Sequence, residues 1–155
     1  MKRTTHALRV TSILLAGIVL AGCTSKGSAV NMTPQQAKES TQAIEREILG
    51  LVPAQDVVDT SQNSSGVLLT CAEKGAVRWT GGAHADLADG ANLAGILELV
   101  RKDFAGRAGF STQVRADGPD QVLDITYSDG SIWIVGPMKR GAVLSIVSGS
   151  ACFPK

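Results

Sequence analysis

The segment QVLDITYSDGSIWIVGP, residues 121–137, contains two apolar runs separated by Ser-Asp-Gly. In the first run Leu123, Ile125 and Tyr127 alternate with polar residues, which is the period of a strand with one buried face. An Asp-Gly pair between two such runs is a strong signal of a β-hairpin. The segment therefore predicts two adjacent antiparallel strands.

Further apolar runs on both sides of this hairpin predict more strands. They are GVLLTCAE (66–73), AVRWTGGAHADL (76–87), FSTQVRA (110–116) and AVLSIVSGSACF (142–153). Turn residues separate them at Lys74-Gly75, Asp117-Gly118-Pro119-Asp120 and Lys139-Arg140-Gly141. Gly81-Gly82 inside one run predicts a bulge or a strand end.

Two segments have helical periodicity. In 33–53, Thr33, Pro34 and Gln36 form the pattern of a capping box with proline at the first helical position. Apolar residues then recur with a charged group, 45–47, between them, and Gly50 and Pro53 are expected to end the helix. The apolar residues are Ala37, Ile44, Ile48 and Leu51.

The second helix lies within DGANLAGILELVRKDFAGRAGF, residues 89–110. Its stripe for burial on a sheet is Leu93, Ile96, Leu97, Val100 and Phe104. Asp86, Asp89 or Asn92 can cap its start, and Gly106 or Gly109 can end it.

Residues 56–66, DVVDTSQNSSG, are expected to form a polar loop. The predicted order is therefore α-β-β-α-β-β-β-β. Hairpin-connected strands and two one-sided helices predict an α+β two-layer sandwich. Its mainly antiparallel sheet would have five to six strands with both helices on one face.

The N-terminus has the pattern of a secretory signal. The first 22 residues include three cations, Lys2, Arg3 and Arg9, and no acid, and an apolar run from Val10 to Leu20 follows these cations. A helix of that length rises about 16 Å, roughly half of a bilayer's hydrocarbon core. Leu20-Ala21-Gly22-Cys23 resembles the lipobox of bacterial lipoproteins. The resemblance implies cleavage before Cys23 and lipidation of that cysteine.

This interpretation divides the chain into a signal peptide (1–22), a lipidated cysteine with a flexible tether (23–32) and a single domain (33–155). Removal of the signal peptide leaves 12 basic and 14 acidic residues. That balance gives no electrostatic reason to expect a nucleic-acid partner.

Lipidation of Cys23 leaves two cysteines, Cys71 and Cys152. Outside the cytoplasm an even pair is typical of a disulfide, here closing a loop of about 80 residues. Their spacing fits neither a CxxC redox motif nor a zinc knuckle, and a single reactive thiol would leave the other cysteine unexplained.

Three residues in GGAHADLAD, namely His84, Asp86 and Asp89, are the candidates for chemistry. They could ligate a metal or act as base and orienting acid, but a helix-start loop explains them as capping and exposed polar residues. A zinc site needs at least three ligands, and the other histidine, His6, belongs to the signal peptide. No catalytic residue, metal or cofactor is therefore assigned.

Trp79 and Trp133 lie within predicted strands, where large aromatic residues are usually part of the core. Either would be an anchor for a ligand or protein partner if it pointed to the uncovered face of the sheet. Together with His84 they are the candidate binding residues.

The mature region also resembles small lipoproteins of actinobacteria, which generally carry no assigned activity. The shared features are the lipobox, a Gly/Ser tether, the pattern FAGRAGF, Asp-Gly turns and a cysteine near the C-terminus. The leading hypothesis is a non-enzymatic binding module, lipid-anchored on the extracytoplasmic face of the cell membrane. An accessory protein of an envelope complex, or an envelope hydrolase or metal-dependent enzyme using His84, Asp86 and Asp89, are the alternatives.

Overall fold

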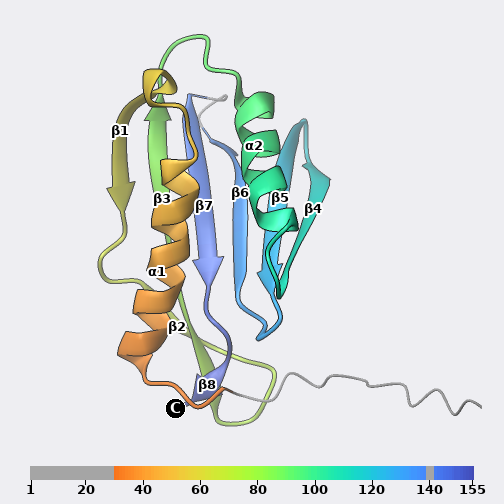
Figure 1. Ribbon diagram of the computed structural model, residues 1–155. Coiled ribbons are helices and arrows are strands. Elements are labelled where there is room, and N and C mark those ends of the chain that lie inside the picture. Colours follow the sequence, from red (N-terminus) through yellow and green to blue (C-terminus); the bar gives the residue numbers. More distant parts are fainter. Residues whose placement is uncertain (1–29, 139–141) are drawn as a thin grey trace, which may run out of the picture.

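The computed structural model describes residues 30–138 and 142–155. The predicted signal peptide, Cys23, most of the tether and the predicted turn at 139–141 lie outside these residues. Within them, helices α1 (Pro34–Gly50) and α2 (Leu93–Ala105) cover one face of an eight-stranded antiparallel sheet (Figure 1). The predicted α+β class with both helices on one face is confirmed.

The sheet has the order β1-β3-β7-β6-β5-β4, and the short strands β2 and β8 also pair with β3. The strands are β1 (Val57–Gln62), β2 (Val67–Thr70), β3 (Ala76–Leu87), β4 (Phe110–Asp117), β5 (Asp120–Tyr127), β6 (Ile132–Met138), β7 (Val143–Gly149) and β8 (Phe153–Pro154). The predicted strand number and element order are wrong because the polar sequence of β1 predicts a loop. In addition, the last predicted strand divides into β7 and β8.

Strand β1 occupies most of the predicted polar loop and pairs with β3 over Val57–Gln62. It lies at the edge of the sheet, and its four central residues are exposed. Backbone hydrogen bonds to β3 hold it in place, so its side chains do not need to alternate between apolar and polar. A short 3-10 helix, η1 (Ala54–Asp56), leads into it.

The predicted hairpin turns are confirmed where the structure describes them. Gly75, Gly118 and Gly130 all have positive φ angles, which glycine adopts without a steric penalty. Strands β4 and β5 pair as far as Asp117 and Asp120 on either side of a two-residue turn. Each turn thus brings consecutive strands into antiparallel contact.

Helix α2 buries the predicted stripe. Ile96, Leu97, Val100 and Phe104 are buried in the main core, where Phe104 meets Phe110 of β4 edge to face at 5.1 Å. The Asn92 side chain caps the helix by accepting a hydrogen bond from the Gly95 amide at 3.0 Å. Of the three proposed caps, Asn92 is therefore the one used.

Helix α1 begins with the predicted capping box between Thr33 and Gln36. Its buried face differs from the predicted stripe, because Thr41, Gln42 and Glu45 are buried alongside two apolar residues. Positions 37, 41, 45 and 48 follow the helical period, so Glu45 belongs to the buried face, whereas Arg46 and Glu47 are exposed. Ile44 and Leu51 are only partly buried.

The disulfide between Cys71 and Cys152 is present, with their Cα atoms 6.3 Å apart. Cys71 follows β2 and Cys152 precedes β8, and these two strands flank β3 because Val77 pairs with both. The Val30 amide donates a hydrogen bond to the carbonyl of Cys152 at 2.8 Å. Contact with the domain therefore begins three residues earlier than the predicted domain boundary.

Replacing both cysteines, as in Cys71→Ser with Cys152→Ser, should lower the free energy of unfolding by about 2–5 kcal/mol. The bond closes a long loop, so its loss releases chain entropy in the unfolded state. Urea denaturation with and without reductant measures the change. Reductant should destabilise the wild type and leave the double variant unaffected, and equal stability of the two oxidised proteins would contradict the prediction.

Candidate functional site

One face of the sheet carries neither of the helices that the structure describes, and we call it the open face. Strand registers place one row of residues across it, namely Gln113, Asp124, Ile134, Val147 and Gly82. It has exposed apolar side chains, since Val147 of β7 is 51% exposed and Met138, at the end of the adjacent strand β6, is 50% exposed. Exposed apolar groups on a sheet face are typical of a binding surface when they lie together.

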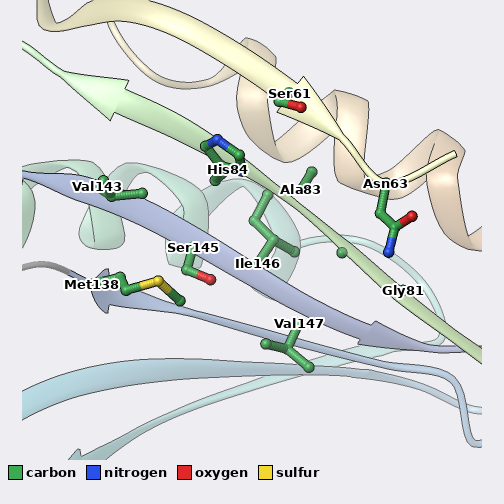
Figure 2. A pocket seen from close by; sticks show the side chains of 11 residues that line it. Ser61, Asn63, Gly81, Ala83, His84, Met138, Val143, Ser145, Ile146 and Val147 are labelled. Atoms are coloured by element: carbon green, nitrogen blue, oxygen red, sulfur yellow. The ribbon is translucent and has the colours of Figure 1, made fainter. Parts of the chain in front are cut away.

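A shallow pocket of about 350 Å³ lies on the open face over β3 and β7. Figure 2 shows that its side chains come from four strands: Ser61 of β1, His84 of β3, Met138 of β6, and Ser145 and Val147 of β7. Asn63 lies just after β1 and contributes to the same wall. The lining is thus part hydroxyl and amide, part aliphatic.

Glycine at position 82 accounts for the hollow. Gly82 presents no side chain to the open face, and a Cβ atom there would lie 2.3 Å from the carbonyl oxygen of Ile146 on β7. Gly81, on the covered face, lies against the ring of Trp79, with a Cβ position 2.1 Å from it. The Gly81-Gly82 pair therefore marks neither a bulge nor a strand end, because β3 continues through it.

The described residues that line the pocket include no carboxylate, lysine or arginine. Ser61, His84 and Ser145 lie side by side in register on three adjacent strands. No hydrogen bond joins the His84 ring to either hydroxyl among the described residues. The backbone of β3 is paired with β1 on one side and β7 on the other here, so its amides are not available to stabilise an oxyanion.

The three residues proposed for catalysis or metal binding do not converge. His84 and Asp86 lie on β3, two positions apart on the open face, whereas Asp89 lies beyond the strand in the connection to α2. His84 lines the pocket, and neither acid does. Within the part of the chain that the structure describes, no three His, Cys, Asp or Glu residues are grouped to hold a metal ion.

Both tryptophans are buried on the face that the helices cover. The Trp133 indole donates a hydrogen bond to the carbonyl of Thr41, and Trp79 packs with Val77 and Phe153 in a second core cluster. The interpretation of these residues as core is confirmed. Of the three candidate binding residues, only His84 reaches the open face.

Most residues that line the pocket cannot be recognised from the sequence. Val147, Met138, Ser61 and Ser145 carry no motif, and the order of the strands rather than their spacing in the chain brings them together. One signal was present in VLSIVSG (143–149). There Ser145 and Val147 alternate with the buried Leu144 and Ile146 and so share the opposite face.

A buried carboxyl group joins α1 to the sheet behind the open face. Glu45 accepts hydrogen bonds from Gln62 Nε2 of β1 at 2.7 Å and from Ser148 Oγ of β7. Burial raises the pKa of the Glu45 carboxyl above its ordinary 4.5, and the hydrogen bonds from Ser148 and Gln62 partly oppose that rise. Gln62 Nε2 also donates to the carbonyl of Gln42, so β1 is fastened to the helix through one side chain.

Comparisons with protein-family models, curated proteins and solved structures found no match to this chain. Among residues 30–138 and 142–155, no helix combines the length and apolarity needed to cross a membrane.

Gly82→Ala should destabilise the protein by about 1–3 kcal/mol, because the added methyl group would force β3 and β7 apart. Gly50→Ala is the control, since no atom lies within 4 Å of a Cβ at that position. Urea denaturation of both variants measures the difference. Equal stability of Gly82→Ala and wild type would contradict the close approach of the strands.

The wild type should lose stability as the pH rises and the buried Glu45 carboxyl ionises, and Glu45→Gln should remove this loss. A carboxyl group with a raised pKa in the folded state contributes its full stability below the unfolded pKa, and this contribution is lost as the pH rises through the folded pKa. The wild type should therefore lose stability relative to Glu45→Gln above about pH 4.5.

Free energies of unfolding at a series of pH values on both sides of 4.5 test this. Glu39→Gln is the matched control, because Glu39 lies on the same helix and is exposed. Parallel pH profiles for the wild type and Glu45→Gln would show that the buried carboxyl has no such effect.

Proposed function

We propose that the protein is a non-enzymatic binding module, anchored by lipid on Cys23 to the extracytoplasmic face of the cell membrane. The open face of the sheet is the binding surface. The observation that carries the proposal is the one-sided cover of the sheet, which leaves an apolar, hollowed face exposed.

Two features support the extracytoplasmic anchor. The lipobox-like Leu20-Ala21-Gly22-Cys23 follows a cationic and then an apolar segment, the order of a secretory signal. The bond between Cys71 and Cys152 is of the kind that persists in oxidising compartments. Two acyl chains on one residue give stable membrane attachment.

The lining of the pocket supports binding of a small, uncharged ligand. The hydroxyl and imidazole groups can exchange hydrogen bonds with it, while Met138, Val143 and Val147 offer apolar contact beside them. The absence of a paired nucleophile and base among the described lining residues favours binding over hydrolysis.

Intact-mass measurement of the membrane-extracted protein tests the anchor. The expected mass lacks residues 1–22, carries lipid, and increases by two hydrogen atoms when reductant supplies two electrons and two protons to open the disulfide. A mass that retains residues 1–22 would overturn the anchor.

Native mass spectrometry of the same preparation tests the pocket. Ser145→Trp should fill the hollow and abolish co-purification of a bound small molecule, because the new ring would occupy its space. Gln113→Trp places the same ring on the open face at the far strand β4 and should retain the ligand. Equal recovery from both variants, or no bound molecule in the wild type, would contradict binding in this pocket.

A further inference from the structure

Strand β2 has three consecutive exposed aliphatic residues. Val67, Leu68 and Leu69 are 58%, 48% and 49% exposed, and all four residues of the strand are exposed. Edge strands in soluble proteins usually carry charged residues that prevent association. The edge strand β1 has Asp59 and further polar residues beside its exposed Val58, whereas β2 has no charged residue.

The apolar side chains of β2 project on both faces of the sheet. Leu68 is opposite Trp79 and shares its face, whereas Leu69 is opposite Arg78 on the other face. Val67 shares the face of Leu69. Alternation of apolar and polar residues, which follows from one buried and one wet face, is therefore missing. Such a pattern fits a strand whose two faces both meet an apolar environment.

This strand lies where the N-terminal segment enters the domain. Val30 is hydrogen-bonded to Cys152, Cys152 is covalently joined to Cys71, and Cys71 directly follows β2. Figure 1 shows β2, β8, the first turn of α1 and the C-terminus gathered at the lower end of the domain.

The anchor would bring a bilayer within reach of this end. Val30 lies seven positions after Cys23, and a chain of seven residue steps spans at most about 24 Å. Resting on the proposed lipid anchor, we propose that Val67, Leu68 and Leu69 insert into the surface of the lipid bilayer and orient the domain on it.

The depth of insertion follows from the backbone. Among the described strands β2 pairs only with β3, so the amide and carbonyl groups on its outer edge need water and cannot enter the hydrocarbon core. The strand therefore lies at the boundary between headgroups and acyl chains. Nearby charges are mixed, with Arg78 and Glu73 both beside Leu69, so apolar contact rather than headgroup charge drives the interaction.

Photo-crosslinking of the full-length lipidated protein tests the insertion. The protein is reconstituted into phosphatidylcholine vesicles that contain a lipid with a diazirine in its acyl chain, and adducts are located by tandem mass spectrometry. Wild type should acquire adducts on residues 67–70. Leu69→Asp should lower their yield about tenfold, because a charge opposes insertion.

Leu99→Asp is the matched control. Leu99 is 48% exposed, close to the 49% of Leu69, but lies on α2, which packs over β4, β5 and β6. This variant should retain adducts on residues 67–70 and acquire none on α2. Circular dichroism checks the fold of both variants, and Val67→Asp replaces Leu69→Asp if the latter does not fold.

The outcomes distinguish membrane contact by β2 from the lipid anchor on Cys23. Lipid on Cys23 with no adducts on residues 67–70, or with equal adducts in wild type and Leu69→Asp, overturns membrane contact by β2 and leaves the anchor standing. A chain without lipid on Cys23 overturns the anchor and the orientation together.

Discussion

The architecture depends on the hydrogen bonds of one long strand. β3 has 12 residues, and its backbone pairs with β1 and β2 along one edge and with β7 and β8 along the other. The amides and carbonyls of a buried strand need hydrogen-bond partners on both edges. Short and polar segments therefore pair with β3. Strand β1 buries few of its side chains, and its backbone hydrogen bonds to β3 hold it in the sheet.

Close backbone approach in this strand also shapes the site. Small residues recur along β3 where it meets β7, since Gly82, Ala83 and Ala85 lie in their paired region. On the covered face this lets α1 approach the sheet, with Ala83 and Ala85 buried in the core. On the open face the missing side chain of Gly82 leaves the hollow that Met138 and Val147 border. One strand therefore determines both the helix packing and the pocket.

Local patterns predicted the parts of the fold that local physics determines. The stripe of α2, the capping box of Thr33 and Gln36 and the glycine turns could be read from neighbouring residues. Strand β1 could not, because its stability comes from pairing with a strand distant in sequence. The burial of Glu45 was missed for a similar reason, since its partners Gln62 and Ser148 are distant in sequence. Prediction of the pocket requires the strand order, and of its lining residues only His84 is a candidate from the sequence.

Both ends of the domain are secured at the same place. The amide of Val30 bonds to Cys152, the amide of Lys155 bonds to Gly75 at 3.0 Å, and the disulfide lies between these two attachments in the fold. A mechanical load applied through the N-terminal segment therefore enters the domain beside its covalent cross-link. The hydrogen bond from Val30 transmits part of this load to the cross-linked strands β2 and β8, and the backbone transmits the rest to α1, which begins at Pro34.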